Sequence, residues 1–315
     1  MANTVTQITL GIDVSKDELV IHHREDGTSC TLNNDRDSIR AWLKRLPAPA
    51  RLAVEPTSRY HFELVEQCHA LGHRVFLVNP RQLVHYRESV GERHKSDLDD
   101  ARLLARFLDR EASQLRAFRP NSRNAQALWG LIKRRATVVE ARIQLRQSLS
   151  DMKLPQQALM SQFRLLLQRI DQRIQALIQS LGWQADYQRC LSLPGIGPLN
   201  AAALVCTFHR ASFSGSDAFV AYLGLDVRRR ESGTFKGKRK LTKRGEPALR
   251  RLLFCATQAA RNHDRFDRYY HAQLDKGLPK TAAKIILARK LARIAFALMA
   301  RQENFMPKQN PRNSP

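Results

Sequence analysis

The first part of the chain opens with three short apolar runs that are rich in β-branched residues. They occupy residues 6–14, 18–24 and 29–34, and a turn signal, EDGT, separates the second run from the third. Together they predict a three-stranded meander.

Helical and strand-like patterns then alternate up to about residue 111. Apolar spacing predicts helices over 35–46, 59–71 and 96–111, with strands over 51–56 and 73–80 between them. Three strands followed by helix, strand, helix, strand and helix is the element order of the RNase H-like fold. We therefore expect an α/β, RNase H-like domain in this part of the chain.

The middle of the chain, residues 120–184, has the pattern of two long helices that separate near KLPQQ. Six apolar residues of the second helix recur at alternating steps of four and three, which is a coiled-coil seam. They are Phe163, Leu167, Ile170, Ile174, Leu177 and Leu181. The seam fits a hairpin packed within one chain or a contact between two protomers, and we expect the second for a spacer that carries no chemistry.

The remainder predicts mainly helices. PGIG at residues 194–197 lies between two short helical patterns and indicates a helix-hairpin-helix, in which Gly195 and Gly197 would let backbone amides approach a phosphate; a plain interhelical turn is the alternative. Residues 277–300 predict a basic amphipathic helix, and the final PKQNPRNSP has the composition of a disordered tail.

Charge is divided unequally along the 315 residues. The net charge is +24 and the pI about 10.7. Residues 1–112 contain 16 Lys and Arg against 17 Asp and Glu, whereas residues 113–315 contain 37 against 12. The whole positive excess therefore lies in the second part, which predicts that this part binds a nucleic acid.

Several classes of protein are disfavoured by the composition. The five cysteines form no CxxC pair, which argues against a structural zinc site or a disulfide framework. The first residues lack the basic start and apolar core of a signal peptide, and no apolar run approaches the roughly 18 residues of a membrane span. We expect a soluble, cytoplasmic protein.

Four acids fall at corresponding points of the expected α/β domain. Asp13 interrupts the apolar first strand, Glu55 closes a later strand, and Asp97 and Asp100 share one face of a helix from which Asp99 points away. Taken singly, the helix acids could complement a helix N-terminus and Glu55 could be a satisfied strand-end acid. Together they indicate a site for one or two Mg²⁺ ions, because gathered like charges repel unless cations bridge them.

A strongly basic loop, RRRESGTFKGKRKLTKRG, runs from residue 228 to residue 245. Its candidate nucleophiles are the hydroxyls of Ser232, Thr234 and Thr242. Its cations are expected to hold phosphates, and they are Arg228, Arg229, Arg230, Lys236, Lys238, Arg239, Lys240, Lys243 and Arg244.

These pieces resemble, in order and over nearly the whole chain, the DEDD transposases of the insertion sequence 110 family. The resemblance is carried by GIDVSK, AVEPTSRYH, LVNP, KSDLDDARLLARF, LPGIGPLNAAALV, GLDVRRRESGTFKGKRKLTKRGEPALRRLLF and ARKLARIAF. It implies a RuvC-like catalytic domain over 1–118, a coiled-coil spacer over 119–185, a transposase domain over 186–302 and a disordered tail over 303–315.

The resemblance also implies roles for individual residues. The family's acidic tetrad falls on Asp13, Glu55, Asp97 and Asp100, and its serine nucleophile falls on Ser232. The implied mechanism joins a Mg²⁺-bound acidic site to a covalent phosphoserine link with DNA. Implied partners are donor and target DNA, a structured noncoding guide RNA called the bridge RNA, and further copies of the chain, as dimers that assemble into tetramers in a bacterial, nucleoid-associated setting.

Two other classes of function fit the residues alone. One is a metal-dependent junction nuclease that cuts by attack of water, with Ser232 as a hydroxyl that only contacts phosphate. The other is a nucleic-acid-binding protein without activity, whose acids are structural. A covalent protein–DNA adduct separates the recombinase from the nuclease, and dependence on a divalent metal separates both from the binder.

Overall fold

A computed structural model describes residues 8–306 apart from 48, 93, 95, 153–154, 229–230, 233–234 and 238–239, with the backbone alone at 231–232 and 235–236. Contacts divide the chain into two compact units, residues 1–120 and 121–315. The predicted spacer, 119–185, shares the second unit with the predicted transposase domain. Each unit is described by itself.

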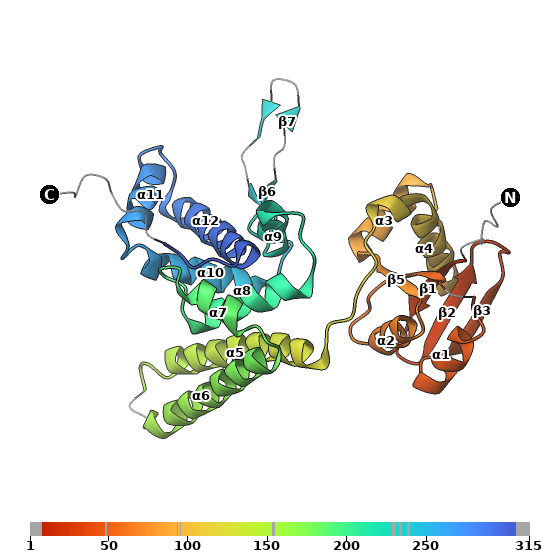
Figure 1. The fold of residues 1–315 in the computed structure, drawn as a ribbon, viewed down its shortest axis with the longest axis horizontal. Helices are drawn as coiled ribbons and strands as arrows, with labels where there is room; N and C mark the ends of the chain where they lie inside the picture. The colour runs from red at the N-terminus through yellow and green to blue at the C-terminus, as the bar shows by residue number, and fades with distance from the viewer. Residues whose placement is uncertain are drawn as a thin grey trace. The chain divides into compact units, whose positions relative to one another are not determined.

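The first unit is built on a five-stranded mixed sheet (Figure 1). The strands are β1 (Thr9–Val14), β2 (Glu18–His23), β3 (Ser29–Asn33), β4 (Arg51–Val54) and β5 (Arg74–Leu77). Their order across the sheet is β3-β2-β1-β4-β5. The first three strands form the predicted meander and are antiparallel, while β4 and β5 run parallel to β1. β1 therefore lies at the centre of the sheet.

Four α-helices and a 3-10 turn accompany this sheet. They are α1 (Arg36–Leu43), α2 (Phe62–Ala70), α3 (Pro80–Ser89), α4 (Asp97–Glu111) and η1 (Ala112–Gln114). One core cluster joins α1 and α2 to the sheet, and a second joins α4 to β4 and β5. α4 also lies directly against β1 and β2.

Gly11 allows α4 to approach β1 closely. A Cβ atom built on Gly11 would lie 1.9 Å from the carbonyl oxygen of Ala101 and 2.4 Å from the amide nitrogen of Ala105, both in the α4 backbone. Neither backbone atom can move aside as the end of a flexible side chain could. The absence of a side chain at this position therefore sets the distance between the central strand and the helix that carries Asp97 and Asp100.

Helix α3 was missed by the sequence analysis, which extended the preceding strand to Pro80. Asn79 caps this helix by accepting a hydrogen bond from the amide of Arg81, and Pro80 occupies its first turn. An Asn cap followed by proline is a recognised start signal for a helix. The omission matters because α3 carries Arg87.

The second unit is mostly helical around one large core. Its helices are α5 (Arg123–Ser148), α6 (Gln157–Ser180), α7 (Gln184–Leu191), α8 (Pro198–Arg210), α9 (Ser216–Tyr222), α10 (Pro247–Ala260), α11 (Asp264–Leu274) and α12 (Lys280–Arg301). A single cluster of buried side chains extends from α5 to α12. The predicted spacer helices are thus part of the same hydrophobic core as the helices that follow them.

Helices α5 and α6 pack against each other as a hairpin within the chain (Figure 1). Leu167, Ile174 and Leu177 of the predicted seam are buried, and Ile170 and Leu181 pack against the core. The expectation that this seam pairs two protomers is therefore wrong for Leu167, Ile174 and Leu177, which the chain itself buries, and it stays a prediction for the partly exposed residues of the seam. Packing within one chain buries the same apolar surface without the entropy cost of association.

Gly195 is the first glycine of the turn between α7 and α8, and its surroundings show a packing role. Gly195 has a positive φ of 87°, and a Cβ atom on it would lie 2.5 Å from the backbone of Ala260 at the end of α10. Gly197 caps α8 with an ordinary φ of −86° and has open space around it. Gly195 is therefore required for packing, and phosphate binding by these amides stays a prediction.

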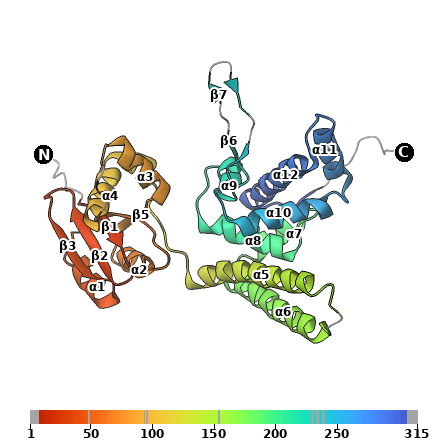
Figure 2. The same cartoon turned by 180° about the vertical axis from the view of Figure 1, so that it is seen from behind.

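Four two-residue strands form an arm between α9 and α10 (Figures 1 and 2). They are β6 (Val227–Arg228), β7 (Glu231–Ser232), β8 (Phe235–Lys236) and β9 (Lys240–Leu241). β6 pairs with β9, β7 pairs with β8, and both pairs are antiparallel. The views show β7 and β8 farther from the helices than β6 and β9. We call residues 226–244 the arm.

The cations of α12 are largely engaged within the chain. Arg293 forms an ion pair with Asp217 at 2.8 Å, and the Lys290 ammonium lies 3.7 Å from the centre of the Tyr269 ring. No helix among the described residues is long and apolar enough to cross a bilayer. Helix α12 was predicted as a basic amphipathic helix; Lys290 and Arg293 make contacts within the chain, whereas Lys280 and Arg301 at its ends are exposed.

Part of the segment predicted as a disordered tail is ordered. The amide of Phe305 donates a hydrogen bond to the hydroxyl of Ser192 at 2.8 Å, and its ring packs near Phe266. The Phe305 ring is partly buried against the core, and this burial offsets the entropy cost of ordering these residues. The rest of the predicted tail, residues 307–315, lies outside the described residues.

Candidate acidic site and basic arm

Asp13 is the central carboxylate of the acidic group. It is partly buried near the end of β1, one residue past the Ile12–Val54 pair of the parallel ladder. The pKa of Asp13 is raised from its ordinary 3.8 to about 6, mostly by burial and further by the carboxylates of Asp97, Asp100 and Glu55, in that order. The four predicted acids therefore lie close enough to act on one another electrostatically.

Three elements of the first unit bring these acids together. Glu55 directly follows β4, the parallel neighbour of β1, so it ends at the same edge of the sheet as Asp13. Asp97 and Asp100 lie in the first turn of α4, the helix that Gly11 allows onto β1. The convergence that the sequence predicted thus follows from strand order and one close helix–strand contact.

Asp100 has a cationic partner that the sequence analysis did not identify. The Arg87 guanidinium forms an ion pair with Oδ1 of Asp100, and the two side chains are only 15% and 13% exposed. This pair links α3 to α4 within the acidic group. A positive charge at this place offsets part of the repulsion among the four carboxylates.

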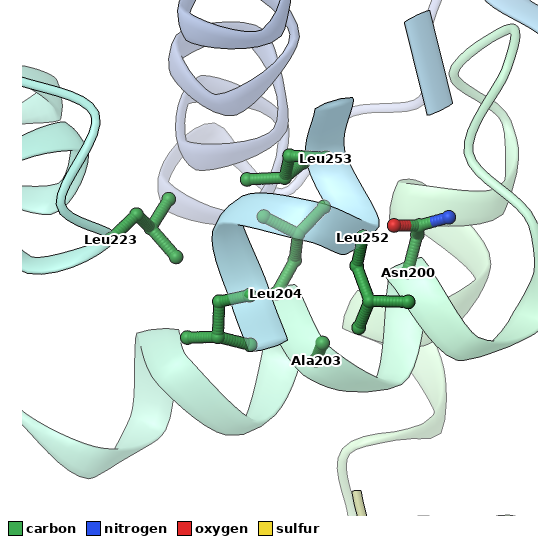
Figure 3. Close-up of a pocket in the computed structure, with 7 residues that line it drawn as sticks. Asn200, Ala203, Leu204, Leu223, Leu252 and Leu253 are labelled. Atoms are coloured by element: carbon green, nitrogen blue, oxygen red, sulfur yellow. The ribbon is translucent and has the colours of Figure 1, made fainter. Parts of the chain in front are cut away.

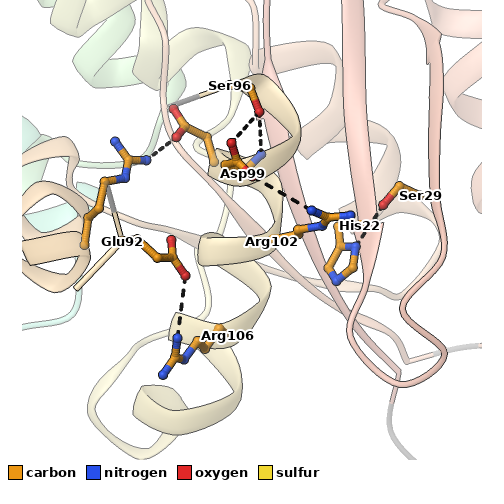
Figure 4. A network of polar contacts seen from close by, with 9 residues as sticks. His22, Ser29, Glu92, Ser96, Asp99, Arg102 and Arg106 are labelled. Carbon is orange, nitrogen blue, oxygen red and sulfur yellow. Dashed lines mark hydrogen bonds and ion pairs between the residues drawn. The ribbon is translucent and has the colours of Figure 1, made fainter. Parts of the chain in front are cut away.

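Asp99 is hydrogen-bonded to Ser96 at the N-terminus of α4 (Figure 4). The Ser96 hydroxyl accepts a hydrogen bond from the amide of Asp99 at 3.1 Å and donates one to its carboxylate at 2.7 Å. Arg102 lies 3.9 Å from the same carboxylate. Ser96 therefore caps α4, and the Asp99 carboxylate is engaged with this cap; Asp99 is not among the carboxylates that raise the pKa of Asp13.

The acids are within electrostatic range of one another but are not arranged as ligands of one ion. Across the described ranges, no three His, Cys, Asp or Glu side chains stand close enough together to hold a metal. One of the four carboxylates, that of Asp100, is held by its ion pair with Arg87. The donor set itself, carboxylate oxygens only, suits Mg²⁺.

Ser232 lies in the outer pair of strands of the arm. Its backbone pairs with Phe235, and Glu231 pairs with Lys236. Of the predicted phosphate-binding residues, Arg228, Lys240, Lys243 and Arg244 have exposed side chains. Arg229, Arg230, Lys238 and Arg239 lie outside the described residues, as does Thr234. The structure thus places the candidate nucleophile on a strand-paired arm with cations along it.

Thr242 differs in role from the other hydroxyls of the loop. Its hydroxyl donates to Oδ1 of Asp226, and its amide donates to the carbonyl oxygen of Asp226 at 3.0 Å. The sequence analysis had grouped Thr242 with Ser232 and Thr234 as equivalent candidates. Only the pairing of β6 with β9 brings Asp226 next to Thr242, so no local sequence signal could have separated it from the others.

Two family profiles match the chain. One, described as a transposase of the IS110 DEDD type, covers residues 10–153, and the other, described as the transposase IS116/IS110/IS902 family, covers residues 187–271. The chain belongs to the IS110 family of DEDD transposases. The first match contains the four clustered acids of this transposase and the second contains Ser232.

Relatives of this IS110-family transposase align over nearly its full length. A probable family 20 transposase of Pseudomonas aeruginosa is 26% identical over 95% of this chain and 98% of its own. The pilin gene-inverting protein of Moraxella lacunata is 25% identical over 94% and 97%, respectively. The transposase of insertion sequence IS1328 from Yersinia enterocolitica is 25% identical over 92% and 96%.

A small hollow lies in the helical unit of the transposase (Figure 3). It lies between α8 and α10, is partly open to solvent and too narrow for a water molecule, and is lined by leucines, Ala203 and Asn200. Its lining contains no titratable side chain. The hollow is therefore a gap in helix packing that offers no group for catalysis.

Proposed function

We propose that this transposase cuts and rejoins DNA strands with Ser232 as the nucleophile and with Asp13, Glu55, Asp97 and Asp100 as ligands of one or two Mg²⁺ ions. The single observation that carries the proposal is the convergence of Asp13, Glu55 and the first turn of α4 at one edge of the sheet, where burial and the neighbouring carboxylates raise the pKa of Asp13. Such a shift costs stability and is typical of functional sites. The strand order of the first unit is consistent with an RNase H-like, RuvC-like fold.

The acids of the first unit would hold the metal. Carboxylates of Asp13, Glu55, Asp97 and Asp100 are hard oxygen donors, and their like charges favour a divalent cation among them. Bound Mg²⁺ would stabilise negative charge on a phosphodiester and its leaving oxygen. Asp99 would stay outside the ligand set because its carboxylate accepts a hydrogen bond from Ser96, the cap of α4.

Ser232 would carry the covalent step. Its Oγ would bond to phosphorus while the bond from phosphorus to the sugar oxygen breaks; the serine hydroxyl loses its proton and the departing sugar oxygen gains one. Reversal of this exchange at a second strand end would rejoin DNA without an external energy source. The exposed cations Arg228, Lys240, Lys243 and Arg244 would hold the phosphates of the strand.

The partners of the reaction belong to the same proposal. Donor and target DNA would bind the basic second unit, and a structured noncoding RNA would guide their choice, as the family resemblance implies. The chain would act as a dimer that assembles into a tetramer. The turn at Gly195 and Gly197 would serve as a helix-hairpin-helix that contacts the DNA backbone, and the domain boundaries would be those expected from the sequence.

Trapping of protein–DNA adducts tests the nucleophile. The wild type incubated with DNA, guide RNA and Mg²⁺ should yield denaturation-resistant adducts, and Ser232→Ala should yield none while its DNA affinity changes little, since it removes one oxygen and no charge. Chelator should abolish the adduct in the wild type.

The acids provide the matched controls for this experiment. Asp100→Asn should abolish cleavage, whereas Asp99→Asn should cost only part of the helix cap and retain most activity. Free DNA ends without an adduct from an active wild type, or an adduct that persists in Ser232→Ala, would assign the chemistry to water at the acidic site.

A further inference from the structure

The arm carries Ser232 at a distance from the helices that support it. Asp226 and Ser232 are six residues apart, and an extended chain of that length reaches about 20 Å. A change of about 10° in the direction of such a lever moves its end by about 3 Å, which is enough to remove a nucleophile from attack distance. Whatever holds the base of the arm therefore controls where Ser232 lies.

The base of the arm is held by two hydrogen bonds between the same two residues. The Thr242 hydroxyl donates to the Asp226 carboxylate, and the Thr242 amide donates to the Asp226 carbonyl. The next residues form the β6–β9 pairs Val227↔Leu241 and Arg228↔Lys240. The bonds of Thr242 thus begin the strand ladder and define its register.

The connection of the arm to the helices is closed by two glycines in contact. A Cβ atom on Gly245 would lie 2.4 Å from the amide nitrogen of Gly224, and one on Gly224 would lie 2.5 Å from that of Gly245. Arg250 of α10 donates a hydrogen bond from Nη1 to the carbonyl oxygen of Gly245. The two ends of the arm are therefore packed backbone against backbone and tied to α10.

We propose that Thr242 and Asp226 form a clasp that directs the arm, which makes them positioning residues for the reaction at Ser232. The proposal rests on the role of Ser232 given above. The clasp acts through geometry, because the Thr242 hydroxyl is committed to Asp226 at the base of the arm. From the sequence, Thr242 was only one of three candidate nucleophiles in the basic loop.

Thr242→Val and Thr242→Ser test the clasp as a pair. Valine keeps the shape and loses the hydroxyl, whereas serine keeps the hydroxyl, so only valine should release Asp226. Amide hydrogen exchange of residues 226–244 should be about fivefold faster in Thr242→Val, the effect of losing one hydrogen bond, and near wild type in Thr242→Ser. Exchange in α10 should be unchanged in both.

The rate of DNA strand cleavage should change in the same variants as the rate of amide hydrogen exchange. Thr242→Val should lower the rate of adduct formation about 10- to 100-fold, while DNA affinity changes less than about threefold, because no phosphate-binding charge is lost. Thr242→Ser should restore the rate. Thr137→Val is the control for the substitution itself, since the Thr137 hydroxyl only reaches its own helix backbone at 3.4 Å.

Three results would overturn the clasp: unchanged exchange in Thr242→Val, full cleavage by Thr242→Val despite faster exchange, or equal defects in Thr242→Val and Thr242→Ser. Ser232→Ala, assayed beside them, separates this proposal from the one it rests on. A fully active Ser232→Ala overturns both. An inactive Ser232→Ala together with a fully active Thr242→Val overturns only the clasp.

Discussion

At the scale of the residue, Asp13 makes the metal-free protein sensitive to pH. Its pKa is about 6 in the folded chain against 3.8 ordinarily, so the folded state favours the protonated form. The stability that protonation supplies is present at low pH and is lost as pH rises from about 4 through about 6.

Asp13→Asn should remove this loss. In chelator, the variant should be more stable than the wild type by about 1–2 kcal/mol near pH 7.5 and equal to it near pH 4, as judged by urea unfolding. Added Mg²⁺ should stabilise the wild type more than the variant. A variant that is less stable than the wild type at both pH values would show that a fixed positive group holds Asp13 ionised.

The acidic residues could be predicted and their positive partner could not. Asp13 and Glu55 interrupt or close apolar strands, and Asp97 and Asp100 share a helix face, so pattern alone points to them. No pattern in the sequence singles out Arg87 in this way. It is one of many arginines, and only the packing of α3 beside α4 shows which carboxylate it meets.

At the scale of the element, the contact between β1 and α4 determines whether the acids converge. Gly11→Ala would place a methyl group against the α4 backbone at Ala101 and Ala105, so the helix must move away from the sheet. We expect a loss of about 3 kcal/mol in the free energy of unfolding and weaker Mg²⁺ binding, measured by urea unfolding and by the Mg²⁺ dependence of the melting temperature.

Gly27→Ala is the control for this substitution. Gly27 lies in an open turn with a φ of 72° and nothing near its missing Cβ, so the change there costs only backbone strain of about 1 kcal/mol. Equal Mg²⁺ responses of the two variants would refute the link between Gly11 and the acidic group.

Elements with regular apolar periods were predicted well, and elements defined by pairing were not. All five strands of the sheet and helix α4 were predicted at nearly their observed bounds, because the strands are short apolar or β-branched runs between turn signals and α4 has a helical apolar period. The strands of the arm were read as a loop, since Val227–Arg228 and Lys240–Leu241 are too short to show a period. The seam of α6 was recognised, yet its partner could not be, because an intramolecular helix and a second protomer present the same kind of surface.

At the scale of the whole molecule, charge separates the two units. Residues 1–120 contain 18 Lys and Arg against 17 Asp and Glu, a net of +1, which leaves 35 against 12 and a net of +23 for residues 121–315. Internal ion pairs such as Arg293 with Asp217 are already included in this net charge, and the remaining cations keep the second unit strongly positive.

DNA binding should therefore reside in residues 121–315. The full chain should lose about 10³-fold or more in affinity between roughly 50 and 200 mM salt, because several phosphate contacts release counterions, and residues 1–120 should bind weakly at every salt concentration. Fluorescence anisotropy with labelled DNA measures both. Binding by residues 1–120 as tight as that of the full chain would contradict this division of charge.

The meeting of Gly224 and Gly245 makes the arm a modular insertion. The two ends of the arm meet at Gly224 and Gly245. A linker of a few residues could therefore replace the arm and join α9 to α10 with little entropy cost. Lineages can therefore lengthen, shorten or exchange this segment without refolding the core between α9 and α10. The same property makes it a natural unit for grafting between relatives, with Gly224 and Gly245 as the splice points.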